Sequence, residues 1–238
     1  MLVAAAVCPC PPLLVPEVAA GAAAELDGLR AACYDAVAVP AAARPDRLVV
    51  IGPAEQAGRG PHPQGAPGSF RGVGVDLGVR LGPADGPPAS ERVLPLSLAI
   101  AGWLLERTRW AAAPVEGLGV GEPLSADRCA EVGREIATGA ERVALLVMGD
   151  GSACRSVRAP GYLDERATGF DAGVARALAA VDTAALMALD EELAHELKAA
   201  GRAPWQVLAG AAEGAELNGE LLYDEAPYGV GYHVATWS

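Results

Sequence analysis

Short apolar runs alternate along this chain with longer segments of helical composition, and this alternation limits the possible folds more than any other feature. The four runs read LVAAAV (2–7), RLVVIG (47–52), VEGLGV (115–120) and RVALLVMG (142–149). They have the length of strands, and all but the third are almost uniformly apolar. Strands of this kind are typical of parallel sheets that are covered on both faces. The alternation therefore predicts an α/β fold.

The segments between these runs carry the signals of helices and turns. Helices are expected at 16–37, 95–108, 125–139, 168–182, 182–201 and 204–214. Pro16 and Pro95 mark two helix starts, and Ser125 and Gly139 bound a third helix as N-cap and stop. A Gly- and Pro-rich loop is expected at 54–72, an extended run at 74–82, and two closing strands within 220–237. No repeat or break in composition divides the chain, so we predict one domain over 1–238, with a mostly parallel or mixed central sheet and helices on both faces.

The charge of the chain excludes some classes of partner. Its net charge is -12, which argues against a nucleic-acid binder, because such binding needs a basic face. The same charge disfavours docking on an anionic membrane. No apolar run reaches the roughly 20 residues that a spanning helix requires, and the first residues lack the positive charge of a signal peptide. We therefore expect a cytoplasmic protein that binds neither nucleic acid nor membrane.

The five cysteines do not form the pattern of a disulfide framework. Cys33 and Cys129 fall in helical segments and are expected to be buried as small apolar residues. Cys8 and Cys10 form a Cys-x-Cys pair without a second pair elsewhere, so a zinc knuckle is not predicted.

Three loops follow predicted strands and are therefore candidates for a site. They are CPCPP (8–12), GPAEQAG (52–58) and GDGSACR (149–155). Ligands of open α/β sheets bind at the carboxyl ends of the strands, so we expect the three loops to converge.

Common motifs do not explain the third loop. GDGSACR lacks the Lys of a phosphate-binding P-loop and the third Gly of a dinucleotide-binding turn. As a hydrolase nucleophile, Ser152 would need Gly in place of Asp150 and Cys154, with His195 or His233 as base. Cys154 is a weaker candidate nucleophile, because no His lies near it in the sequence.

The order of four stretches resembles the class III extradiol ring-cleavage dioxygenase superfamily, which includes the catalytic subunit of protocatechuate 4,5-dioxygenase and the Memo-like proteins. CPCPPLLVPE (8–17) is similar to the family's Pro-His-Pro-Pro opening, and RLVVIGPAEQ (47–56) to its strand ending in Gly-Pro-x-His. LLVMGDGSACR (145–155) with GFDAGVARAL (169–178) resembles the Ser-Gly-Asp-x-Ser-His turn and the helix after it. APWQVLAGA (203–211) and YDEAPYGVGYHVA (223–235) resemble the closing helix and strands.

This resemblance implies a site in which two His and one Glu would hold Fe(II), with a further His as acid and base. Carried over one position at a time, the His ligands fall on Cys10 and Glu55, and the acid/base His falls on Ala153. The Glu ligand falls near Gly201 or Arg202. The resemblance therefore implies a divergent member of the family in which each of these positions holds a different residue.

Two functions follow from this departure. The first is a non-catalytic member that binds a small molecule or a protein and holds no cofactor. The alternative is a dioxygenase-type oxidoreductase, acting on an aromatic or related small molecule, with Fe(II) or zinc on the substituted ligands Cys10, Glu55 and His62. Against the metal stands a simpler interpretation, in which Cys10 is an apolar filler, Glu55 is solvated and His62 is exposed. Whether the protein is an enzyme stays open at this point.

The remaining candidate pocket residues are Asp150, Ser152 and Arg155. Asp150 is expected to accept backbone N–H bonds and Ser152 to cap the next segment, so that both maintain the turn. Arg155 either pairs with an anionic ligand or covers the surface. The resemblance also implies a possible homodimer; helix 95–108, with Trp103 and Trp110, supplies either its interface or part of the core.

Overall fold

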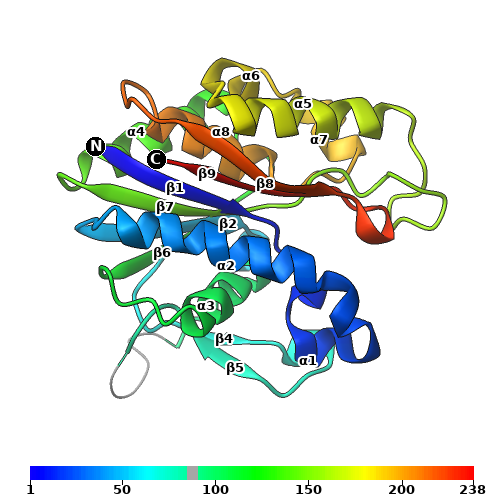
Figure 1. Cartoon of the computed structure of the whole chain (residues 1–238), viewed down its shortest axis with the longest axis horizontal. Helices are drawn as coiled ribbons and strands as arrows, with labels where there is room; N and C mark the ends of the chain where they lie inside the picture. The colour runs from blue at the N-terminus through cyan, green and yellow to red at the C-terminus, as the bar shows by residue number, and fades with distance from the viewer. Residues whose placement is uncertain (85–90) are drawn as a thin grey trace.

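The computed structural model describes residues 1–84 and 91–238, and a seven-stranded sheet forms its centre (Figure 1). The order across the sheet is β3-β6-β2-β7-β1-β9-β8. The seven strands are β1 (Leu2–Cys8), β2 (Arg47–Pro53), β3 (Gly60–His62), β6 (Val115–Val120), β7 (Val143–Met148), β8 (Gly219–Glu225) and β9 (Tyr232–Trp237). The neighbours β6, β2, β7 and β1 are parallel, whereas β3 and β9 pair antiparallel at their two sides. The mixed sheet confirms the predicted α/β fold.

Helices cover both faces of this sheet, as predicted. They are α1 (Pro16–Ala19), α2 (Asp27–Ala42), α3 (Leu96–Arg107), α4 (Ala126–Thr138), α5 (Arg166–Ala180), α6 (Thr183–Met187), α7 (Glu191–Glu196) and α8 (Arg202–Ala211). In Figure 1, α2 and α3 lie below the sheet, and α4, α5 and α8 lie above it. A separate hairpin of β4 (Pro67–Ser69) and β5 (Gly78–Arg80) lies beside α3.

The uniform hydrophobicity of the central strands follows from this double cover. In β7, Ala144, Leu146 and Met148 pack into the core between the sheet and the helices α2 and α3. Val143, Leu145 and Val147, which alternate with them along the strand, pack into the second core, between the other face of the sheet and the helices α4, α5 and α8. Because successive side chains of a strand point to opposite faces, both faces of β7 must be apolar.

Two predicted helices are interrupted in the structure. The segment expected to be one helix over 182–201 forms α6 and α7, because the Asp190 side chain accepts the backbone N–H of Leu193 at 2.7 Å and starts a new helix. Within 16–37, the chain forms α1 and a 3-10 turn before α2 begins. Ala20, with φ at 48°, ends α1 because a residue with positive φ cannot continue a right-handed helix.

The predicted loop at 54–72 contains the short strands β3 and β4, whose Gly and Pro content hides them from a sequence pattern. The expected extended run at 74–82 is confined to β5. Helix α3 belongs to the core: Trp103 is 2% exposed and Trp110 6%. Of the two roles left open for this helix, the structure therefore supports core packing within a single chain.

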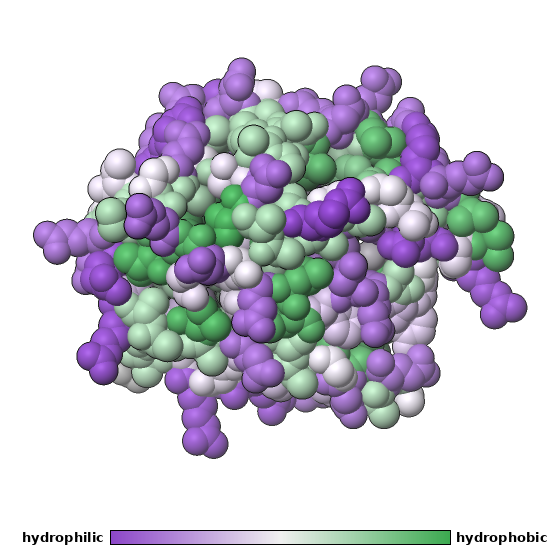
Figure 2. Space-filling model, turned by 45° about the horizontal axis from the view of Figure 1, so that its top comes forward, coloured by the Kyte–Doolittle hydropathy of each residue, from purple (hydrophilic) through white to green (hydrophobic). Residues whose placement is uncertain are grey.

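Figure 2 shows one face of the molecule, on which hydrophilic side chains are scattered between hydrophobic areas and along the edge. Among the described residues, no helix combines the length and apolar character needed to cross a membrane. The large apolar side chains that stay exposed are Met1, Val93, Val157, Tyr162, Leu163 and Tyr228.

Candidate functional site

The three loops that follow β1, β2 and β7 converge, as predicted. These strands are parallel and adjacent in the sheet, so their carboxyl ends meet at one edge. The backbone N–H of Cys10 donates to Oδ1 of Asp150 at 2.7 Å, and the N–H of Gly149 donates to the carbonyl of Cys8 at 3.0 Å. The loop after β1 and the loop after β7 are thus joined directly.

A cavity of about 660 Å³ opens at this edge. Cys10 and Glu55 line it, and the segment that leads into α3 supplies part of its apolar wall through Leu94, Leu96 and neighbouring residues. The Ser97 hydroxyl, also on the wall, donates to the carbonyl of Pro53 at 2.7 Å. The volume lies within the range of small-molecule sites.

Cys10 lies at the wall of this cavity with 9% of its surface exposed. Burial raises the pKa of its thiol well above the usual value, and the nearby Asp150 and Cys8 raise it further. A thiol must lose its proton to act as a strong metal ligand or nucleophile. The burial of Cys10 suits the expected role of a small apolar filler.

Glu55 and His62, the other two residues of the substituted metal site, have opposite environments. Glu55 is exposed at the rim of the cavity, as expected for a solvated carboxylate. The expectation that His62 is exposed is wrong: it is 1% exposed on β3, and its Nε2 lies 2.8 Å from the carbonyl of Gly58. Pairing of β3 with β6 takes the ring away from solvent and places it at a different cavity of about 440 Å³.

The structure does not bring the three residues together around a metal ion. Cys10 and Glu55 line the larger cavity, but His62 does not. Within residues 1–84 and 91–238, no group of three His, Cys, Asp or Glu side chains is arranged to hold a metal ion. The set Cys10, Glu55 and His62 therefore does not fit Fe(II) or zinc.

Asp150 lies beside Cys10 and is largely shielded from water. Burial raises the pKa of its carboxyl to about 7, and the hydrogen bond from the Cys10 backbone lowers it by a smaller amount. The carbonyl of Asp150 also accepts the N–H of Gly201 at 2.8 Å. The predicted role of Asp150 in holding the turn is thus seen in its contacts, and its carboxyl exchanges a proton near neutral pH.

Ser152 and Arg155 both contact Asp171, a buried residue of α5. The backbone N–H and hydroxyl of Ser152 donate to the Asp171 carboxylate at 2.8 and 2.7 Å. The Arg155 guanidinium pairs with the same carboxylate at 2.9 Å. Arg155 therefore has an internal anion as partner, in place of the ligand that the sequence allowed. Asp171 was missed as a site residue, although it stands in the GFDAGVARAL stretch that supports the resemblance.

The geometry offers no hydrolase nucleophile paired with a base among the described residues. The Ser152 hydroxyl faces the Asp171 carboxylate, and neither ring nitrogen of His233 makes a hydrogen bond. His195 lies on the surface, with Nδ1 2.7 Å from a carboxylate oxygen of Glu122. Burial raises the pKa of the Cys154 thiol, which contacts backbone carbonyls.

His233, which the sequence offered only as a base for a hydrolase, is also buried. It lies on β9 with its ring against Trp205, at 6.2 Å between ring centroids. Burial lowers the pKa of its imidazole, and the nearby Asp171 and Asp224 oppose this effect. Its Nδ1 lies 3.1 Å from Asp224, but the angles do not make a hydrogen bond.

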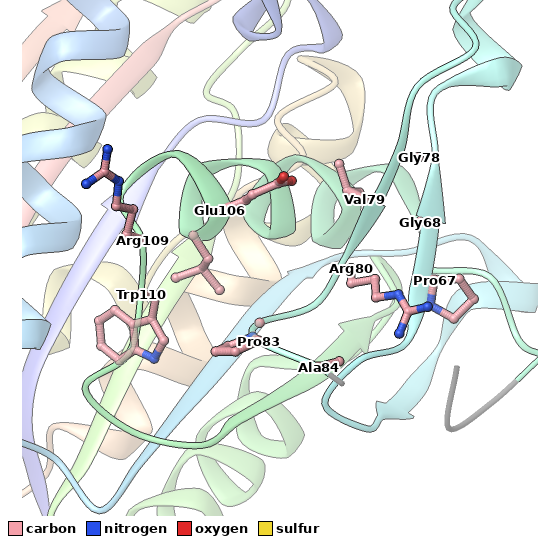
Figure 3. Close-up of a pocket in the computed structure, with 12 residues that line it drawn as sticks. Pro67, Gly68, Gly78, Val79, Arg80, Pro83, Ala84, Glu106, Arg109 and Trp110 are labelled. Atoms are coloured by element: carbon pink, nitrogen blue, oxygen red, sulfur yellow. The ribbon is translucent and has the colours of Figure 1, made fainter. Parts of the chain in front are cut away.

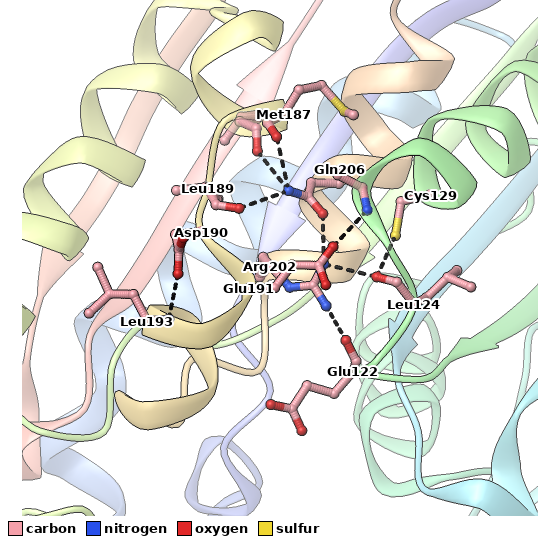
Figure 4. A network of polar contacts seen from close by, with 12 residues as sticks. Glu122, Leu124, Cys129, Met187, Leu189, Asp190, Glu191, Leu193, Arg202 and Gln206 are labelled. Atoms are coloured by element: carbon pink, nitrogen blue, oxygen red, sulfur yellow. Dashed lines mark hydrogen bonds and ion pairs between the residues drawn. The ribbon is translucent and has the colours of Figure 1, made fainter.

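The positions near which the resemblance places the Glu ligand do not supply a carboxylate. Gly201 packs against Gly149, and a Cβ added to Gly201 would overlap the indole of Trp205. The buried guanidinium of Arg202 donates to the carbonyl oxygens of Glu122 and Leu124 and to the side chain of Gln206 (Figure 4). These contacts anchor the start of α8 to the loop after β6.

Another cavity, of about 550 Å³, lies near the amino end of β6, between the β4–β5 hairpin and the end of α3 (Figure 3). Arg80, Glu106 and Trp110 are among the residues that line it. The Trp110 indole N–H is already used by the carbonyl of Ala113 at 2.8 Å. Because ligands of this fold class bind at carboxyl ends of strands, we regard the cavity at Cys10 and Glu55 as the stronger candidate.

Comparison with known proteins gave a structural likeness only. Neither the family models nor the curated proteins match this sequence. Among solved structures, the chain is similar to the crystal structure of the uncharacterized protein JW3007 from Escherichia coli K12, with a TM-score of 0.50 and 15% sequence identity over 98% of each chain. At this identity, the likeness shows that the two proteins share a fold.

Proposed function

We propose that this protein is a metal-free, non-catalytic relative of the class III extradiol dioxygenases that binds a small molecule in the cavity beside Cys10 and Glu55. One observation carries the proposal: a cavity of about 660 Å³ lies where the resemblance places the iron site, but its wall offers a shielded thiol and one exposed carboxylate. Three N and O ligands are needed for a facial Fe(II) site. The binding cavity is therefore kept without the metal chemistry.

The first test is metal content. The protein is purified without chelators and its metals are quantified, before and after anaerobic loading with Fe(II). Oxygen uptake is then followed with catechol and protocatechuate. We expect less than one-tenth equivalent of metal and no uptake above that of free Fe(II). Stoichiometric iron with uptake would refute the proposal.

The second test asks whether the cavity binds a ligand. A fragment set of small aromatic molecules is screened by ligand-observed NMR against the parent protein and Leu96→Trp, which fills the apolar wall. Val157→Trp is the matched control, because Val157 is exposed outside the cavity. We expect fragments whose binding is lost in Leu96→Trp and kept in the control. If both variants bind equally, the cavity is not the site.

A metal-dependent enzyme is the second candidate, because Cys10 and Glu55 line the same cavity and the Asp150 carboxyl accepts the backbone N–H of Cys10. Soft metals prefer thiolate ligands, so zinc is the metal to test first. Zinc whose binding is lost in Cys10→Ala, but not in Cys129→Ala on α4, would favour this candidate. The variant Cys10→His/Glu55→His/Ala153→His tests the mapping itself: a folded variant that binds no Fe(II) would contradict it.

A homodimer and a cytoplasmic location belong to the same proposal. All five cysteines are free and buried, which suits a reducing compartment. Because Trp103 and Trp110 pack in the core, a dimer would have to use another surface. Light scattering coupled to size exclusion gives the oligomeric state, and a mass of one chain at all concentrations would exclude the dimer.

A further inference from the structure

A second cavity, of about 390 Å³, lies between the loops that follow β2 and β6. These strands are parallel neighbours, but the helices that follow them pack on opposite faces of the sheet. Helix α3 packs on the same face as α2, and α4 packs on the same face as α8. Where neighbouring strands send their chains to opposite faces, a crevice opens at the carboxyl ends of the strands, and α/β proteins bind ligands there. This cavity therefore lies at a favoured position in the fold.

Charged side chains of both signs line the cavity: Glu55, Arg59, Glu122, His195 and Lys198. Only Glu55 among them also lines the larger cavity. The inference therefore does not depend on the proposed function.

Part of this charged lining is already fixed. Nδ1 of His195 lies 2.7 Å from the Glu122 carboxylate. Arg59 reaches back to the carbonyl of Ala54 at 3.4 Å and lies over Gly121, where a side chain would collide with the guanidinium. The absence of a side chain at Gly121 thus lets Arg59 lie along the cavity wall. Within the described residues, the rest of its side-chain N–H groups make no hydrogen bond.

Other charges of the cavity have no partner in the described part of the chain. Neither the Lys198 ammonium nor the Glu55 carboxylate makes a hydrogen bond or salt bridge there. Arg59 and Lys198 suit an anionic group of a ligand, and Glu55 suits a cationic one.

We propose that this second cavity binds a small zwitterion, with its carboxylate at Arg59 and Lys198 and its ammonium at Glu55. The fixed His195–Glu122 pair also lines the cavity. A molecule that carries both charges satisfies both kinds of side chain, whereas a simple anion leaves Glu55 unpaired and facing like charge. The site thus selects amino acids over plain carboxylates and plain amines.

The test uses β-alanine, γ-aminobutyrate and 6-aminohexanoate, each beside the alkanoate and the alkylamine of equal length. Binding is followed by NMR from the imidazole signals of His195, because the other two histidines, His62 and His233, are buried. One amino acid of the series is expected to bind about tenfold more tightly than its alkanoate or its amine, the ratio expected for one charge-assisted contact.

Variants separate the two ends of the site. Lys198→Met and Arg59→Gln are expected to weaken the amino acid and the alkanoate together, by about fivefold to tenfold. Glu55→Gln is expected to remove the preference for the amino acid over the alkanoate. Arg128→Gln is the control, since Arg128 is exposed on α4 beside Glu131. Equal binding of amino acid and alkanoate, equal weakening by Arg128→Gln, or no shift of the His195 signals would overturn the proposal.

Discussion

The contacts of Asp171 make the substitution Asp171→Ala the sharpest test of how the GDGSACR turn is held. The carboxylate is fully buried and accepts three bonds from the turn, two from Ser152 and one from Arg155. The turn is also joined to β9, because the N–H of Gly151 donates to the carbonyl of Gly231 at 2.7 Å. Removing the carboxylate leaves that backbone bond but takes away the anchor on α5.

The cost of Asp171→Ala follows from the donors that it leaves behind. The N–H of Ser152 is buried and loses its partner, at about 1–3 kcal/mol, and the Ser152 hydroxyl adds a smaller amount because it can rotate. Arg155 is 27% exposed, so water recovers part of its lost pairing. The sum is about 3–5 kcal/mol, similar to the cost of breaking a buried ion pair. For a domain stable by about 5–15 kcal/mol, this is a large fraction.

Urea denaturation at pH 7.5 measures this cost. Asp171→Ala should lower the midpoint strongly, whereas Asp76→Ala, an exposed carboxylate beside Arg71, should leave it nearly unchanged. Ser152→Ala alone should cost about 1 kcal/mol. The double variant Asp171→Ala/Ser152→Ala should cost less than the two single costs added together, because it has no Ser152 hydroxyl to lose its hydrogen-bond partner. A loss below about 1 kcal/mol for Asp171→Ala would refute the assigned role of Asp171, since a single lost neutral bond accounts for that much.

Three further predictions concern pH and packing. Since the pKa of Asp150 is raised to about 7, its carboxyl binds a proton more tightly in the folded protein than in the unfolded chain. The stability of the fold should therefore decrease as pH rises from about 4 to about 7. Asp150→Asn should reduce this decrease, measured as the change in urea midpoint with pH. Because burial lowers the pKa of His233, the stability tied to its neutral form is present above about pH 6.5 and lost as pH falls. His233→Phe should therefore reduce the drop in midpoint between pH 7 and 5.5, and an unchanged drop would contradict a neutral buried imidazole. Gly201→Ala should destabilise by about 1–3 kcal/mol through overlap with Trp205, whereas Gly169→Ala, with no neighbouring atoms, should be neutral or stabilising in thermal melts.

The sequence predicts the layers of the fold because each strand is a local pattern. The run at 142–149 becomes β7, and both of its faces are covered, as its uniform hydrophobicity requires. The interrupted helix over 182–201 shows the limit of such patterns. Gln206 donates to the carbonyl oxygens of Leu186, Met187 and Leu189, where the backbone leaves the helix. A partner 17–20 residues away along the chain cannot be read from helical periodicity.

The convergence of the three candidate loops was predictable, and their contacts were less so. Convergence of the three loops follows from parallel strands alone. The burial of His62 depends on β3, three residues long, pairing with β6. The second cavity forms because α3 and α4 pack on opposite faces of the sheet. A single sequence does not determine on which face each helix packs. Both outcomes come from tertiary packing, which overrides local propensity.

The GDGSACR turn looks like a catalytic loop in the sequence, yet its polar groups are used inside the protein. Asp150 holds the Cys10 backbone, Ser152 and Arg155 hold Asp171, and the Cys154 thiol contacts the carbonyls of Gly161 and Leu197. A side chain that already bonds an internal partner has fewer bonds left for a substrate, and breaking the internal bond to gain one costs about as much as it returns. Among the described residues at this edge of the sheet, the Glu55 carboxylate and the Lys198 ammonium make no hydrogen bond or salt bridge, so these two groups on the neighbouring loops are free to bind a ligand.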